Sequence, residues 1–148
     1  MTKSLSSSNK TTSTPQISQI VIPHTLPPYQ LEQPADYKSI SQIVDGMIQV
    51  VCIPSQHHPM FGKISGGNLY LNEEGKLRGL PPNIIATILA ATLGVGLSPD
   101  DIICGQVVLL GPTDPKGFDT SVDPKVWSAV TYTTVLAAAI RNTAAILR

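Results

Sequence analysis

Residues 67 to 111 carry, one after another, the signals that most restrict how this chain can fold. NLYLN, residues 68–72, alternates as a strand, and the turn that follows it uses Gly75 to supply a positive φ. Two prolines then lead into an apolar run that stops at Gly94. Residues 102–110, IICGQVVLL, are the most strand-like segment of the chain, and Gly105 inside them predicts a close backbone approach.

Two short helices are predicted from their entry signals. Pro82 suits the first position of one helix, and Asn83 suits its cap or first turn. Residues of one face recur at helical spacing: Ile84, Ile85, Ile88, Leu89 and Thr92. The other helix, residues 37–44, has Asp36 as a plausible N-cap and ends at Gly46.

The chain before residue 67 also predicts two strands. QISQIVIP, residues 16–23, is β-branched and strand-like. Residues 24–34 are broken by prolines and predict a connector without regular structure. MIQVVCI, residues 47–53, is uniformly apolar, which is typical of an interior strand rather than an edge strand. Residues 54–67 predict a loop.

Asp123 and Pro124 predict the start of a helix that runs to the C-terminus, because an N-cap aspartate followed by proline favours helix entry. Apolar and small residues recur along it at alternating spacings of four and three, as a continuous seam: Val126, Val130, Thr133, Ala137, Ile140, Ala144 and Leu147. Further apolar residues lie off this seam: Trp127, Val135, Leu136 and Ile146. A helix that is apolar on more than one side predicts burial between layers or against another subunit.

These elements predict an α+β fold: a small mixed sheet of about four or five strands, two short helices on one sheet face and a long C-terminal helix. At 148 residues the chain is long enough for one core, so residues 17–148 are expected to form a single domain. Residues 1–16 are rich in Ser and Thr and predict a disordered tail. Their lysines, without an acid, leave a transit peptide as an alternative.

The charge balance argues against several classes of partner. Ten Lys and Arg residues balance ten Asp and Glu residues, so no basic face for nucleic acid is predicted. With 14% charged and 42% hydrophobic residues, the chain is expected to bury much surface, which can include a subunit interface. The longest uncharged run, residues 79–99, is too broken by prolines and glycines to span a membrane. No secretory signal is visible, and we expect a cytoplasmic protein.

Metal and redox chemistry find little support. Cys52 and Cys104 lie in apolar runs and predict two small buried core residues, with a disulfide between two central strands as the alternative. His57 and His58 are adjacent, so one metal cannot easily use both; a solvated loop is expected, with weak metal affinity as the alternative. The Asp100–Asp101 pair predicts a turn rather than a cation site. We therefore expect no metal and no cofactor.

Lys76, Arg78 and Asn83 are the candidate ligand-binding residues. Asn83 can cap its own helix, or it can present its amide to a ligand at the helix N-terminus. With Lys76 and Arg78 nearby, that helix end would favour a small anion. Glu73 and Glu74 are adjacent carboxylates on a turn and predict a charged tip rather than an acid–base pair. No pattern in the sequence predicts a catalytic residue.

The same stretch carries a family pattern: N-E-x-G with a lysine–leucine pair, then L-P-x-N, a helix and a G-x5-G strand. The matching positions are Asn72, Glu73, Gly75, Lys76, Leu77, Leu80, Pro81, Asn83, Gly105 and Gly111. With the preceding VDGMIQVVCIP, residues 39–111 resemble a family of small proteins of unknown function found on phages, plasmids and bacterial genomes. The resemblance implies a small mixed α/β fold and an accessory gene of a mobile element, but no activity. The tail and the helix after Asp123 lie outside it.

Two functions follow as expectations. The first is a non-enzymatic accessory protein that acts as a homo-oligomeric binding or adaptor module, with the C-terminal helix as the contact between copies. The alternative is a binder of a small anionic, nucleotide-type ligand at the corner formed by Lys76, Arg78 and Asn83. Neither expects a nucleic-acid or membrane partner, and a protein partner remains open.

Overall fold

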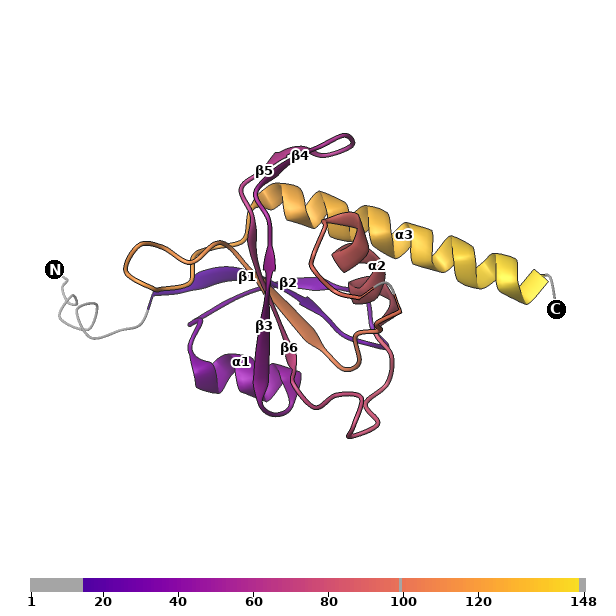
Figure 1. The fold of residues 1–148 in the computed structure, drawn as a ribbon, viewed down its shortest axis with the longest axis horizontal. Helices are drawn as coiled ribbons and strands as arrows, with labels where there is room; N and C mark the ends of the chain where they lie inside the picture. The colour runs from indigo at the N-terminus through magenta and orange to yellow at the C-terminus, as the bar shows by residue number, and fades with distance from the viewer. Residues whose placement is uncertain (1–14, 99, 147–148) are drawn as a thin grey trace, which may run out of the picture.

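The computed structural model describes residues 15–98 and 100–146, which form a five-stranded sheet, a separate two-stranded hairpin and three helices (Figure 1). In chain order the elements are β1 (Ile17–Ile22), β2 (Tyr29–Gln33), α1 (Tyr37–Val44), β3 (Ile48–Ile53), β4 (Gln56–His58), β5 (Gly62–Ile64), β6 (Gly67–Asn72), α2 (Ile84–Thr92), β7 (Val107–Leu110) and α3 (Pro124–Ile146). The predicted disordered tail falls on residues that are almost all outside the described ranges, and so does Leu147.

The predicted α+β class is confirmed, but the sheet is antiparallel in every pair rather than mixed. Its strand order is β2-β1-β7-β6-β3. The central strand β7 lies between β1, from the start of the domain, and β6, from its middle. The centre of the sheet therefore depends on pairing between strands that are far apart in the sequence.

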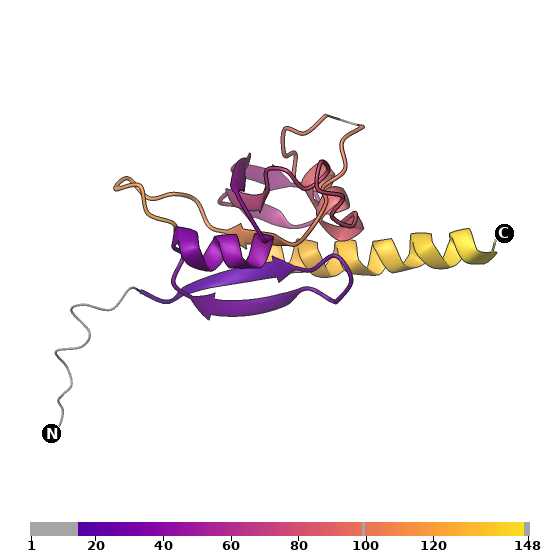
Figure 2. The same cartoon turned by 90° about the horizontal axis from the view of Figure 1, so that it is seen from below.

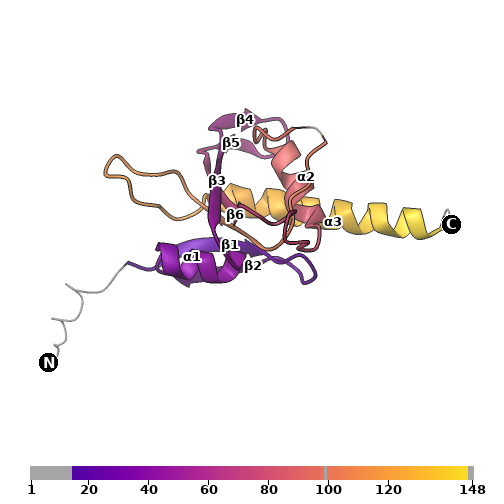
Figure 3. The ribbon, with the colours of Figure 1, turned by 60° about the horizontal axis from the view of Figure 1, so that its bottom comes forward.

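The two short helices pack on opposite sheet faces, so the expectation that they share one face is wrong (Figures 1 and 3). Successive residues of a strand point to opposite faces. Val108 therefore packs in the cluster with Ile40 and Val44 of α1, while Leu109 packs in the cluster with α2 and α3. Because every residue of β7 is buried, both faces of the sheet need a helical cover.

Both edge strands differ from the expectation. Residues 24–34 were expected to be irregular, yet β2 pairs with β1 along its whole length. The prolines that suggested a connector, Pro27, Pro28 and Pro34, flank the strand and do not interrupt it. β3 was expected in the interior but forms the opposite edge, where Val50 is 49% exposed.

The expected loop at residues 54–67 contains a hairpin, β4–β5, that projects from the sheet (Figure 1). An aromatic contact ties it to α3: the ring of Phe61 lies 4.8 Å from the ring of His58 and 5.9 Å from the ring of Tyr132. The two histidines therefore belong to a strand of this hairpin rather than to an irregular loop.

The predicted N-caps of the two short helices are confirmed, but the C-cap of α1, the position of Pro82 and the start of the last strand differ from the prediction. The side chain of Asp36 accepts from the Ser39 N–H at 2.8 Å. α1 ends at Val44, and its C-cap is Asp45, in a left-handed conformation, rather than Gly46. Asn83 is the N-cap of α2. Pro82 lies outside that helix and forms an isolated bridge with Cys104, and the last predicted strand is regular only from Val107.

The expectation of two buried cysteines is wrong for Cys52, which is exposed, and Cys104 is half-buried. Both are free thiols. Cys52 is exposed because β3 is an edge strand, and on this face the α1 cluster partly covers Ile48 at the start of the strand.

Asp123 fastens the start of α3 to the rest of the domain. One carboxylate oxygen accepts from the backbone and hydroxyl of Ser65, at 3.0 and 3.2 Å, and the other accepts from the Lys125 N–H at 2.9 Å. Partial burial acts to raise the pKa of Asp123, but these hydrogen bonds outweigh it and hold the pKa below its usual value.

Asp123→Ala is expected to lower the free energy of unfolding at neutral pH by about 1 kcal/mol, as for other lost N-caps. A lowered folded-state pKa means that the stabilisation is present above the unfolded pKa and is lost as pH falls through the folded value. The difference between wild type and variant should therefore shrink below about pH 4. Urea unfolding between pH 7 and pH 3 measures this. Asp100→Ala, at an exposed residue, is the control and should change little at any pH. A difference that is independent of pH would contradict the assignment.

Candidate functional site

Asn83, one of the three predicted binding residues, is a structural residue. It is 1% exposed, and its side-chain oxygen accepts from the Ala86 N–H at 3.0 Å. Its amide nitrogen donates to the carbonyls of Ile22 and Gly105, at 2.8 and 2.9 Å. Of the two readings of this residue, the cap is confirmed. The amide is fully engaged in joining α2 to β1 and to the approach to β7, so it is not presented to a ligand.

Arg78 holds the end of α1. Its guanidinium contacts the backbone carbonyl of Asp45 and lies 3.3 Å from the carboxylate of the same residue. The amide of Asn72 donates to the carbonyls of Val44 and Asp45, both at 3.0 Å. A cation and an amide at a helix C-terminus satisfy its free carbonyls. The family-pattern residue Asn72 and the candidate residue Arg78 thus serve one structural junction.

Lys76 forms an ion pair with Asp101. This hydrogen bond is the main reason that the pKa of Asp101 lies below its usual value. The pair joins the turn after β6 to the segment that precedes β7. Lys76, Arg78 and Asn83 therefore have three separate partners.

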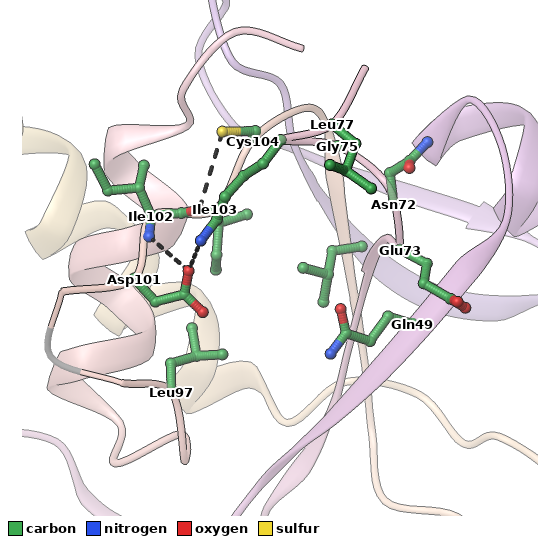
Figure 4. Close-up of a pocket in the computed structure, with 12 residues that line it drawn as sticks. Gln49, Asn72, Glu73, Gly75, Leu77, Leu97, Asp101, Ile102, Ile103 and Cys104 are labelled. Atoms are coloured by element: carbon green, nitrogen blue, oxygen red, sulfur yellow. Dashed lines mark hydrogen bonds and ion pairs between the residues drawn. The ribbon is translucent and has the colours of Figure 1, made fainter. Parts of the chain in front are cut away.

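A pocket of about 220 Å³ lies beside Lys76 but is not lined by Arg78 or Asn83. Figure 4 shows Gln49 and Glu73 on one side of it and Leu97 and Asp101 on the other. Its charged lining residues are one lysine and two carboxylates, Glu73 and Asp101, so the local charge is negative. Pockets that bind small-molecule ligands usually have volumes of about 300–1,000 Å³. Neither size nor charge favours an anionic nucleotide here.

Other groups with metal or acid–base potential do not converge. Among the described residues, no three His, Cys, Asp or Glu side chains are placed to hold one metal ion. His58 uses its Nδ1 to accept from the Met60 N–H at 3.0 Å within its own hairpin. Within the same ranges, no helix combines the length and hydropathy needed to cross a bilayer.

The C-terminal part of α3 is the feature that the packing leaves unexplained. The first part of the helix is buried through Val126, Ala129, Val130, Thr133 and Ala137. Every residue from 138 to 146 is exposed, and we call this range the outer segment of α3. Figures 1, 2 and 3 all show it extending beyond the sheet and α2, with no other element beside it.

The exposed part of α3, which is the outer segment together with Val135 just before it, is apolar on two sides. Ile140 and Ala144 continue the predicted seam past the point where the core ends, and Val135 and Ile146 lie on the far side of the helix. Val135 is 65% exposed, Ile140 53% and Ile146 81%. Arg141 is the single charged residue between positions 126 and 146. A surface helix normally exposes a polar face, and the packing of the described residues does not account for exposed apolar residues on both sides of this helix.

The chain matches a domain of unknown function, DUF3846, over residues 17–136. It belongs to this family. The match covers every described strand, α1, α2 and α3 as far as Leu136. No curated protein and no solved structure shows significant similarity to the chain.

The DUF3846 match is wider than the sequence resemblance, which covered only residues 39–111. It adds β1, β2 and the first half of α3, the elements that complete the two-sided core. It ends at residue 136, close to the place where α3 leaves that core. The outer segment lies beyond the matched domain.

The residues of the recognised pattern hold the DUF3846 domain together. A Cβ on Gly75 would lie 2.7 Å from the carbonyl of Cys104, and one on Gly105 would lie 2.9 Å from the Leu80 side chain. With Asn72 and Asn83, these positions bind the long β6–α2 connection to its neighbours. Of the predicted site residues, Lys76 lines the pocket described above.

Proposed function

We propose that this protein is a non-enzymatic binding module that assembles with copies of itself through the outer segment of α3. The observation that carries the proposal is the continuation of the helix seam: Ala137 is buried, and Ile140 and Ala144 follow it on the same face in solvent. Pairing two such helices would bury these residues, and the free energy gained would be about 25 cal/mol per Å² of apolar surface removed from water.

Several features of the helix favour another helix as its partner. Ala138, Ala139, Ala144 and Ala145 are small, which allows close approach of two helix axes. The seam has the spacing of a helix–helix contact. With Arg141 as the single charge, two copies meet little repulsion. The accessory role and the mobile-element setting are part of the proposal and rest on the sequence resemblance.

This assembly has more support than small-ligand binding. The three candidate residues for an anion each have a structural partner, and the pocket beside Lys76 carries more negative than positive charge. The exposed apolar surface of α3 has no such partner among the described residues.

Light scattering after size exclusion tests the proposal with Ile140→Glu. Wild type should elute with a mass of at least twice 15.7 kDa. The variant should have a lower mass, because it places a charge on the exposed seam and breaks the contact between helices. Ser128→Glu adds the same charge to an exposed position of the inner helix and should leave the mass unchanged. A wild-type protein of monomer mass, or an unchanged mass in Ile140→Glu, would contradict the proposal. Removal of all of α3 is not a suitable test, because Val126 and Val130 belong to the core.

A further inference from the structure

The free edge of β3 is the second surface that the fold leaves open. Among the described strands, β3 pairs only with β6, in the register Ile48↔Asn72 to Ile53↔Gly67. In Figure 1 this strand crosses in front of the rest of the sheet, and no described element lies between it and the viewer. An edge strand presents a row of unpaired backbone donors and acceptors.

The phase of the β3–β6 ladder shows which residues present these groups. The Glu73 N–H donates to the Met47 carbonyl at 2.8 Å, one step beyond the Ile48↔Asn72 pair. Hydrogen-bonded and non-hydrogen-bonded pairs alternate in an antiparallel ladder. The backbone groups of Gln49, Val51 and Ile53 therefore face β6. Those of Ile48, Val50 and Cys52 face outward, and none of them bonds to another loop or strand in the described ranges.

The two edges of the sheet are protected differently. β2 carries Glu32 and has Pro27, Pro28 and Pro34 beside its ends, which are features that block pairing with another chain. β3 has no charge, proline or glycine along its length, IQVVCI. Val50 and Cys52 are exposed on it. An apolar, unprotected edge is a template for another strand.

We propose that β3 pairs antiparallel with β3 of a second copy, about a two-fold axis that passes through Val50. The outward-facing residues then form the hydrogen-bonded pairs: Val50 opposite Val50, and Ile48 opposite Cys52 in both directions. Three such pairs make about six backbone hydrogen bonds between the copies. The two five-stranded sheets become one continuous sheet, with α1 of each copy on the same face.

The strand itself favours a second copy over a different partner. The register is self-complementary, since it places Val, Ile and Cys side chains against one another on one face of the joint sheet. No Asp, Glu, Lys or Arg occurs from residue 46 to residue 62, so the two copies bring no like charges together. The contact is isologous, which closes a dimer and leaves no β3 edge for further addition.

This contact does not depend on α3. If both surfaces are used, two different isologous contacts operate in one assembly, as in tetramers with dihedral symmetry. Variants in one surface leave the other intact, so the two proposals succeed or fail separately.

Disulfide trapping tests the register directly. In the full chain carrying Cys104→Ser, the thiol introduced by Ile48→Cys in each copy should bond to Cys52 of the other copy, which gives two disulfides per dimer. Opposite Cα atoms would lie about 5.5 Å apart, within the disulfide range. A covalent dimer should appear on a non-reducing gel and disappear with dithiothreitol. Gln49→Cys is the matched control: it is exposed on the same strand but points to the other sheet face, and should not cross-link. No dimer with Ile48→Cys, or equal cross-linking by both variants, would overturn the proposal.

Mass measurement provides the second test. Val50→Lys replaces a half-exposed residue, so the fold should be kept, and circular dichroism can verify this. In a dimer, the substitution would bring one positive charge from each copy together at the two-fold axis. The mass should fall by half relative to wild type. If Ile140→Glu has no effect but Val50→Lys yields monomers, the strand contact stands and the helix proposal fails. An unchanged mass in Val50→Lys would overturn the strand contact.

Discussion

Asn83→Ala is expected to lower the free energy of unfolding by about 4 kcal/mol, one of the two largest effects of a single substitution that we predict in this domain. The change removes an N-cap, which contributes about 1 kcal/mol. It also removes the donor of the buried carbonyls of Ile22 and Gly105. Each carbonyl left unsatisfied lowers the stability by about 1–3 kcal/mol. The three lost bonds join β1, α2 and the approach to β7, so their loss acts on the whole domain. Urea unfolding followed by circular dichroism measures the difference.

Asp36→Ala is the matched control for this variant. Asp36 makes the same kind of cap, to the Ser39 N–H at 2.8 Å, but it has no buried bonds and should cost only about 1 kcal/mol. The difference between the two variants isolates the contribution of the buried amide. Equal losses of stability would show that Asn83 acts as a cap alone.

Gly111→Ala should destabilise the domain by about 3 kcal/mol, as expected for overpacking against backbone that cannot move freely. A Cβ at this position would lie 2.2 Å from the Ser121 carbonyl and 2.6 Å from the Thr120 hydroxyl. The Gly111 N–H also donates to the Thr120 carbonyl at 2.8 Å, so the two segments are held together. The melting temperature, measured by calorimetry, should fall accordingly.

Gly96→Ala is the control for a glycine without neighbours. A Cβ there meets nothing within 4 Å, and the backbone needs no left-handed conformation. The substitution should be neutral or should stabilise by about 0.5 kcal/mol through the unfolded chain. If Gly111→Ala were as stable as Gly96→Ala, the close approach of residues 120 and 121 to the end of β7 would be wrong.

The sequence predicts local structure well wherever one short segment decides it. α1 has its predicted bounds, and Asp36, Asn83 and Asp123 are caps, because a cap depends only on a side chain and the N–H groups two or three residues later. The start of α3 follows from Asp123 and Pro124 for the same reason.

The candidate binding corner could not be judged from the sequence. Lys76, Arg78 and Asn83 are close along the chain, but their partners are Asp101, Asp45 and Ile22, which are distant from them in sequence. A charge or an amide is available to a ligand only if no such partner takes it, and only the fold decides that.

The sequence alone thus determined the order of elements after residue 67, the α+β class and the family pattern, because turn glycines, prolines and apolar periods act within a few residues. The tertiary structure decided that residues 102–110 end in a central strand buried on both faces, that β3 is an edge, and that the seam of α3 leaves the core after Ala137. These properties depend on strand pairing and helix packing between distant segments. The stretch from 67 to 111 is therefore the frame of the domain, and the open surfaces lie on β3 and on α3.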